Sequence, residues 1–200
     1  RLQLMRDLAR LALDKRERPI DALDWYGRAF QLDTEDDGLL AEMDRLAAET
    51  SEWTRLVDYV LAAADVASEN ERKVALWQRA AMAARDQIVD PGEAERIFRL
   101  VLAVEPKNVE ALRAVDKLLV AADRAADLEP ILVAETGADD LFDDERVTVW
   151  TRLAELYRDR LARRADAVNA WKQVLELQEM HEGALRALQA MYLEDEQWPE

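Results

Sequence analysis

The sequence predicts an all-α fold, an α-α superhelix of about eleven antiparallel helices, on three observations. Half of the 200 residues are hydrophobic, and only five Gly and five Pro interrupt them, so helix breakers are scarce. Apolar residues recur at helical spacing, most clearly from Val149 to Gln178, where Trp150, Leu153 and Tyr157 share one helix face. The third observation is that the sequence repeats itself.

The internal repeat sets the length of the structural unit. Residues 77–127 align without a gap on residues 150–200 at an offset of 73 residues, which places Trp77 on Trp150 and Arg79 on Arg152. The N-terminal part follows the same frame at an offset of 72 residues. The unit of about 72 residues therefore contains two helical hairpins, and because one hairpin cannot bury all its apolar surface, the hairpins are expected to stack.

The helix boundaries follow from periodicity and from start and stop signals. Asp90, before a proline at the first helical position, and Asn108 are candidate N-caps, as is Asn70. Ser68 with Glu71 is an alternative capping box that would start the fifth helix two residues earlier. In chain order, the eleven predicted helices cover residues 2–15, 19–32, 36–48, 51–66, 70–87, 91–104, 108–121, 125–135, 143–161, 165–177 and 181–194.

The most irregular and most acidic stretch runs from Glu135 to Asp144 and holds the one-residue insertion between the two offsets. Its carboxylates lack the alternate spacing and the central glycine of an EF-hand calcium loop. Phe142 and Val147 flank Asp143 at the spacing of a hydrophobic staple around an N-cap. This stretch is therefore interpreted as a structural loop, and no metal site is predicted.

Large and small apolar residues stand at fixed positions in each hairpin. They are Trp150, Leu153, Ala154, Tyr157, Ala167, Trp171 and Val174 in one copy, and Trp77, Ala80, Ala81, Ala84, Ala94, Phe98, Val101 and Pro106 in the other. This pattern resembles the tetratricopeptide repeat. The resemblance implies a single right-handed solenoid over residues 1–200, with the Trp side chains in packing positions. We expect this solenoid to be a segment of a longer multi-repeat protein. Asp116 departs from the pattern, because the family has a small residue there.

The resemblance also implies a binding groove, because in this family the first helix of each hairpin lines a concave surface. Eight of the eighteen positions that would face it are basic and only Glu155 is acidic, although acids outnumber bases by 43 to 27 in the chain. The residues assigned to the groove are Arg6, Arg10, Arg45, Gln78, Met82, Arg85, Arg113, Lys117, Thr151, Glu155, Arg158 and Arg186. A positive groove would attract an acidic peptide or a carboxyl terminus. The alternative is that Arg and Lys are ordinary helix formers on a solvated face, partly neutralised by adjacent acids.

Composition and motifs argue against several other functions. The formal net charge of −16 disfavours nucleic-acid binding, and the lack of Cys excludes disulfides and thiolate zinc sites. No apolar run is long enough for a membrane span, and a cytoplasmic location is favoured. The lone histidine, His181, stands at a helix start and is expected to cap the helix or lie on the surface rather than to act in catalysis. No phosphate loop or catalytic motif indicates an enzyme, and no cofactor is expected.

The sequence therefore predicts a non-enzymatic scaffold that binds a partner peptide or domain through the groove. The alternative is a purely structural spacer in a long solenoid whose function lies in domains outside these residues. RNA-processing scaffolds built from half-a-tetratricopeptide-type repeats fit less well, because of the acidic charge and a poor match to their Trp and Glu pattern. The apolar face of residues 185–192 is expected to lack cover, which predicts end-to-end self-association.

Overall fold

The computed structural model describes residues 1–16 and 18–195, which are helical apart from short connections. Two of the helices continue into a single π-helical turn, η1 (Ala84–Ile88) after α5 and η2 (Leu156–Arg160) after α9. The α-helices of the described residues are α1 (Leu2–Arg16), α2 (Pro19–Phe30), α3 (Asp37–Thr50), α4 (Trp53–Val66), α5 (Asn70–Ala83), α6 (Pro91–Val104), α7 (Val109–Ala121), α8 (Ala125–Thr136), α9 (Asp143–Glu155), α10 (Arg164–Leu177) and α11 (Glu182–Asp195).

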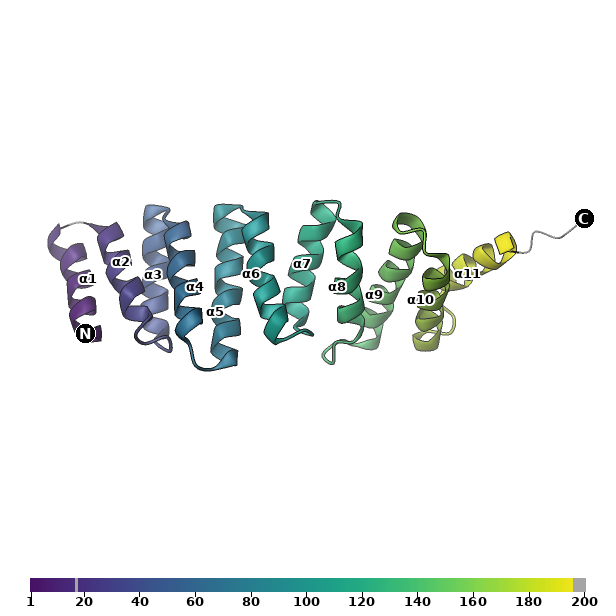
Figure 1. The fold of residues 1–200 in the computed structure, drawn as a ribbon, viewed down its shortest axis with the longest axis horizontal. Coiled ribbons are helices and arrows are strands. Elements are labelled where there is room, and N and C mark those ends of the chain that lie inside the picture. Colours follow the sequence, from purple (N-terminus) through teal and green to yellow (C-terminus); the bar gives the residue numbers. More distant parts are fainter. Residues whose placement is uncertain (17, 196–200) are drawn as a thin grey trace, which may run out of the picture. The chain divides into compact units, whose positions relative to one another are not determined.

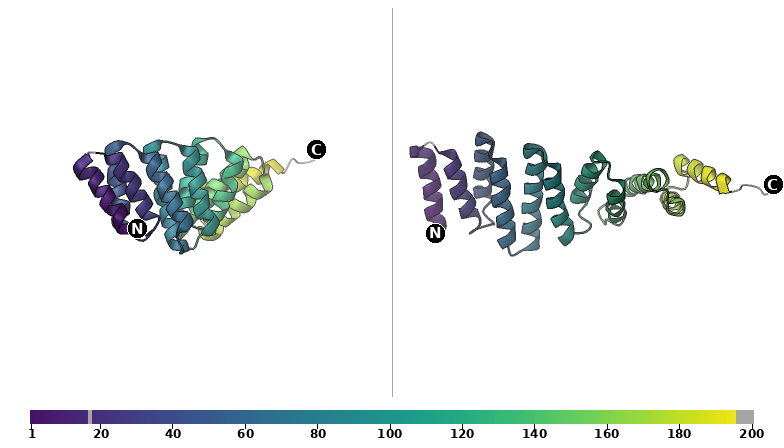
Figure 2. Two further views of the ribbon diagram at one scale, coloured as in Figure 1. Left: turned by 60° about the vertical axis from the view of Figure 1, so that its left-hand side comes forward. Right: turned by 45° about the horizontal axis from the view of Figure 1, so that its top comes forward.

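The helices belong to two compact units, Arg1–Glu105 with α1–α6 and Pro106–Glu200 with α7–α11. In the first unit α1 packs on α2, α2 on α3, α4 on α5 and α5 on α6, so the helices stand side by side in chain order (Figures 1 and 2). In the second unit α8 packs on α7 and α9, and α10 on α9 and α11. The predicted all-α helical-hairpin architecture is confirmed. That residues 1–200 form one solenoid stays a prediction.

The predicted helix starts are confirmed where a short polar side chain caps the helix. Asp90 Oδ1 accepts a hydrogen bond from the backbone N–H of Glu93 at 2.9 Å, at the start of α6. Asn108 Oδ1 accepts one from the N–H of Ala111 at 3.0 Å, at the start of α7. Each bond satisfies a donor that the first turn of a helix leaves unpaired, which is why these residues fix the boundary.

The helix α5 begins at the predicted residue 70, but its predicted N-cap is wrong. Asn70 is the first helical residue rather than the N-cap, and the N-cap position is held by Glu69, whose side chain makes no capping bond. The alternative capping box does not form either, because Ser68 lies one residue before the N-cap. The helix therefore begins without a side-chain cap, and its position is set by the packing of α5 on α4 and α6.

The helices predicted to end at residues 87 and 161 finish in the wider turns η1 and η2. Each turn is followed by a residue in the left-handed region, Val89 with φ 59° and Ala162 with φ 51°. The N–H of Asp90 donates to the carbonyl of Ala84 at 2.9 Å, which closes the wide turn in the first unit. A positive φ costs conformational free energy for any residue other than glycine, and more for a β-branched valine. We infer that tertiary packing imposes this helix ending.

The loop before α9 differs from its predicted form. The predicted staple of Phe142 on Val147 is wrong, because Phe142 is 75% exposed and is itself the N-cap residue of α9. The neighbouring Leu141 is buried instead. Glu145 Oε2 accepts a hydrogen bond from the N–H of Phe142 at 3.2 Å, so the acidic loop is tied to the helix by a carboxylate rather than by an aromatic contact.

The core of each unit consists of small residues that let helices approach and of larger residues that fill the remaining space. Ala81 and Ala94 in the first unit, and Ala154 and Ala167 in the second, are fully or almost fully buried, as predicted. The tryptophans fit the packing interpretation less uniformly. Trp171 is buried, but Trp150 is only half-buried. None of the described helices is long and apolar enough to cross a membrane.

Candidate interaction surface and the Trp150 pocket

The residues assigned to the groove all lie on odd-numbered helices or on the π turns that end them, and are called the odd-helix set below. Six belong to each unit. In the first unit they are Arg6 and Arg10 on α1, Arg45 on α3, Gln78 and Met82 on α5, and Arg85 on η1. In the second they are Arg113 and Lys117 on α7, Thr151 and Glu155 on α9, Arg158 on η2 and Arg186 on α11.

Carboxylates of the same unit hold Arg6 of α1 and Arg45 of α3. The Arg6 guanidinium pairs with Asp36, the N-cap of α3. Arg45 lies between two acids of its own helix, with Nη2 2.8 Å from Glu42 Oε2 and Nη1 2.6 Å from Glu49 Oε1. Hydrogen bonds to Glu42 and Glu49 raise the pKa of Arg45. The neighbouring carboxylates therefore neutralise the positive charge that was predicted at these positions.

The two π turns carry the same surface pair. Arg85 Nε lies 2.6 Å from Asp86 Oδ1, and Arg158 Nε lies 2.6 Å from Asp159 Oδ1. In each pair Nη2 makes a second bond to the other carboxylate oxygen, at 2.7 Å and 2.8 Å respectively. These bonds lower the pKa values of both aspartates. Each pair is a planar, bidentate unit on a partly exposed turn.

Arg113 of α7 is held more tightly, because one of its partners is buried. Its Nε lies 3.2 Å from Glu135 Oε1, and its Nη2 lies 2.7 Å from Glu145 Oε1. The Glu135 side chain is 3% exposed, and burial raises the pKa of its carboxyl although the bond from Arg113 opposes the rise. Arg186 of α11 pairs with Glu182 at 3.0 Å on the open surface. Arg113 thus holds a buried carboxylate in addition to lying on the surface.

Two basic residues of the odd-helix set, Arg10 and Lys117, make no ion pair with the described residues, and both are exposed. Glu155 is exposed as well, whereas Met82 is half-buried. The hydroxyl of Thr151 is buried and has no hydrogen-bond partner among the described residues. The structure thus places the set on the expected helices, while most of its basic groups are already engaged by neighbouring acids.

One ion pair recurs in both units and was not predicted from the sequence. Asp116 of α7 accepts two bonds from Arg152 of α9, each at 2.7 Å, and its side chain is 8% exposed. In the first unit Asp44 of α3 pairs with Arg79 of α5, with an Nε to Oδ2 distance of 3.1 Å. The signal was present in the sequence, because both the acids and the arginines occupy equivalent positions of the internal repeat. The ion pair also explains why Asp116 stands where the repeat pattern has a small residue.

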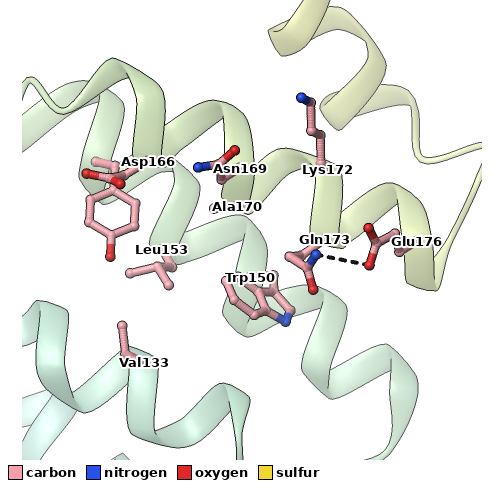
Figure 3. A pocket seen from close by; sticks show the side chains of 10 residues that line it. Val133, Trp150, Leu153, Asp166, Asn169, Ala170, Lys172, Gln173 and Glu176 are labelled. Atoms are coloured by element: carbon pink, nitrogen blue, oxygen red, sulfur yellow. Dashed lines mark hydrogen bonds between the residues drawn. The ribbon is translucent and has the colours of Figure 1, made fainter.

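The second unit contains a pocket of about 500 Å³ beside Trp150, called the Trp150 pocket below (Figure 3). Its floor comes from α9 and η2, with Trp150 half-buried and Leu153 and Tyr157 buried. Ala170 of α10 and Val133 of α8 complete the apolar lining. No member of the odd-helix set lines this pocket.

Polar groups of α10 form the rim of the Trp150 pocket. Gln173 Nε2 donates to Glu176 Oε2 at 3.0 Å, beside Trp150 (Figure 3). Lys172 is exposed, and its ammonium end points away from Trp150 in the same view. Asp166 lies at the other end of the pocket from Glu176 (Figure 3), and its charge acts on Tyr157. An apolar floor with a polar rim is the usual construction of a small binding site.

Tyr157 and Asp166, at the far end of the Trp150 pocket, both contact a cation of the chain, Arg163. The guanidinium of Arg163 lies 4.9 Å from the centre of the Tyr157 ring. Its Nη1 bonds Glu129 at 2.7 and 2.8 Å, and its Nε bonds Asp166 at 2.6 Å. Burial, and then the hydrogen bond to Glu129, raise the pKa of Tyr157 to about 12. Tyr157 is therefore a neutral aromatic donor at any physiological pH.

The single histidine caps a helix, as predicted. His181 precedes α11, and its Nδ1 accepts a hydrogen bond from the N–H of Ala184 at 3.1 Å. Within the described part of the chain, no group of three or more His, Asp or Glu side chains is placed to hold a metal ion.

Apolar side chains of α11 are exposed, as expected from the sequence. Leu185, Tyr192 and Leu193 are 42, 46 and 61% exposed. The predicted self-association through this face stays a prediction.

Comparisons with known proteins show the fold alone. No protein-family model matches the chain, and no curated protein is similar to it. Among solved structures, the C-terminal part of a TPR repeat-containing protein from Cytophaga hutchinsonii is 16% identical, over 94% of this chain and 73% of that chain, with a TM-score of 0.50. PilF of Pseudomonas aeruginosa is 15% identical over 94% of this chain and 81% of that chain, with a TM-score of 0.47. With its helical hairpins and its small buried residues at repeat positions, this chain has the tetratricopeptide-repeat fold.

Proposed function

We propose that the chain is a non-enzymatic scaffold that binds a partner peptide or domain through the odd-helix set. The observation that carries this proposal is the repeated bidentate pair on the π turns, Arg85 with Asp86 and Arg158 with Asp159. A partly exposed ion pair adds little stability. The occurrence of the same pair at equivalent positions in both units is therefore better explained by recognition than by folding.

The chemistry of the partner follows from which charges are engaged. A paired guanidinium and carboxylate offer hydrogen bonds but no net charge, so the π turns suit a polar, uncharged segment such as a peptide backbone. The acidic partner predicted from the sequence belongs to this proposal through Arg10 and Lys117, which make no ion pair with the described residues. An acidic segment elsewhere on the set would have to displace the chain's own carboxylates.

The spacer function is the second candidate, and the same ion pairs favour it. If the paired charges serve only to keep the surface of a long solenoid soluble, the odd-helix set has no ligand. The two functions differ in one measurable property, which is whether this surface binds peptides.

The test is a selection of phage-displayed, unstructured peptides against the whole chain. The informative variant is Arg10→Glu with Lys117→Glu, because neither residue holds a buried acid. Reversing the charge of Arg113 would instead place a second carboxylate beside the buried Glu135. The matched control, Lys107→Glu with Arg96→Glu, makes the same change in net charge on a loop and on α6.

We expect peptides that bind the wild-type chain and the control, and that bind the Arg10 and Lys117 variant about tenfold more weakly. Selected peptides that bind all three proteins equally would place the binding surface elsewhere. If no peptide is enriched, the scaffold proposal fails and the spacer function is favoured.

A further inference from the structure

The Trp150 pocket has the composition of a site for one long basic side chain. Its floor is apolar, with Leu153 and Ala170 each 1% exposed, and Val133 at its mouth is 46% exposed. A volume of about 500 Å³ admits the aliphatic stem and the head of an arginine or lysine. These stems pack readily on apolar surfaces while the charged end seeks polar partners.

The aromatic side chain for such a cation is Trp150, which is half-buried and has no cation over its ring among the described residues. The cation to ring contacts in the described part of the chain involve Trp25, Phe30 and Tyr157, and none involves Trp150. Indole is the side chain that attracts a cation most strongly through its ring face. Glu176 stands beside it at the rim and supplies a carboxylate (Figure 3).

Two residues of the pocket lining, Tyr157 and Asp166, already bind a cation of the chain. Arg163 lies over the Tyr157 ring and is held by the carboxylates of Glu129 and Asp166. The near end has an aromatic ring in Trp150 and a carboxylate in Glu176, and the ammonium end of Lys172 at the rim points away from Trp150 (Figure 3). The net charge of −16 adds a long-range attraction for basic segments.

The equivalent position of the first unit carries larger side chains. Trp77 is the counterpart of Trp150, and the residues that correspond to Ala170 and Gln173 are Ile97 and Leu100. Ile97 is fully buried. Because alanine is smaller than isoleucine, the second unit has less side-chain volume at this position.

We infer that the Trp150 pocket binds an arginine or lysine side chain of a partner polypeptide. The aliphatic stem lies against Leu153 and Val133, and the cationic end lies over the Trp150 indole within reach of Glu176. Gln173 donates to Glu176 through its amide nitrogen, which leaves its carbonyl oxygen able to accept a bond from the cation. The site shares no residue with the odd-helix set, so this inference can be tested independently of the scaffold proposal.

The direct test uses the indole N–H resonances of the whole chain in two-dimensional NMR, with the Trp150 signal assigned by Trp150→Phe. The probe is the peptide N-acetyl-Gly-Arg-Gly-amide. Its controls carry citrulline, which has nearly the shape of arginine without the charge, or norleucine, which keeps only an apolar stem. We expect the arginine peptide to shift the Trp150 signal saturably, about fivefold more tightly than either control. The Trp77 signal should not move, because the position that corresponds to Ala170 carries the larger Ile97 there.

Two variants connect the signal to the pocket. Ala170→Ile introduces the residue that the first unit has at this position, and it should abolish the shift while the chain stays folded by circular dichroism. Glu176→Gln should weaken binding about two- to fivefold, whereas Glu179→Gln, outside the pocket, should not. A norleucine peptide that binds as tightly as the arginine peptide, a binding curve unchanged by Ala170→Ile, or the absence of any shift would each overturn the inference.

Discussion

At the scale of single residues, the pair of Asp116 and Arg152 combines burial with charge. The carboxylate is 8% exposed and takes both of its bonds from one guanidinium, at 2.7 Å each. The hydrogen bond to Asp116 raises the pKa of Arg152. A charge buried in this way is tolerated only while its partner stays in place.

Arg152→Met should therefore destabilise the chain by about 2 kcal/mol. This is below the roughly 3–5 kcal/mol for a fully buried pair, because the Arg152 side chain is 38% exposed. The measurement is urea unfolding followed by circular dichroism. The double variant Asp116→Ala with Arg152→Met should recover most of the loss, since no unpaired charge remains. A single variant as stable as the wild type would show that water solvates Asp116.

At the scale of helices, α2 approaches α4 at Gly27. A Cβ atom on Gly27 would lie 2.3 Å from Cγ of the Tyr59 ring, which no side chain tolerates. Tyr59 is itself fixed, because its hydroxyl donates to Asp24 Oδ1 at 3.1 Å. The absent side chain thus sets the distance between two helices of the first unit.

Gly27→Ala should lower the free energy of unfolding by about 2 kcal/mol, because Tyr59 must leave its place. Gly92→Ala is the matched control, since a Cβ there meets only Asp90 Oδ1, at an ordinary 3.4 Å. The control should be neutral or stabilising by up to about 1 kcal/mol, through the better helix propensity of alanine. Thermal unfolding of both variants separates the two effects. Equal melting temperatures for the two variants would contradict the close approach.

Helix existence and most boundaries could be predicted from the sequence, because amphipathic periodicity and caps such as Asp90 are local signals. The π turn before Val89 could not, because no glycine marks its left-handed residue. The ion pairs of the basic residues could not be predicted from the sequence either. Arg113 meets Glu135 across two helices, and such pairing depends on side-chain conformations that spacing along the chain does not fix. Trp150 was expected in the core but is half-buried, because the cover of its ring depends on side chains of other helices, such as Val133 and Ala170.

At the scale of the whole molecule, stability depends on pH through carboxylates whose pKa values move in opposite directions. Hydrogen bonds from Arg113 and the backbone lower the pKa of Glu145, and the bond from Arg158 lowers that of Asp159. Each contributes stability above its ordinary pKa and loses it as the pH falls. Burial raises the pKa of Glu135, so the folded chain holds this proton more tightly than the unfolded chain does.

The contribution of Glu135 therefore has the opposite sign, and stability is lost as the pH rises through its raised pKa. Glu135→Gln removes this loss while Arg113 keeps Glu145 as a partner. We expect the free energy of unfolding of the variant, minus that of the wild type, to increase from about pH 4 to about pH 8. Glu145→Gln is the control, and its difference from the wild type should fall over the acidic part of the range, because the wild type gains there. Urea unfolding at each pH measures both. A difference for Glu135→Gln that does not change with pH would mean that water reaches this carboxylate and that its burial does not hold the proton.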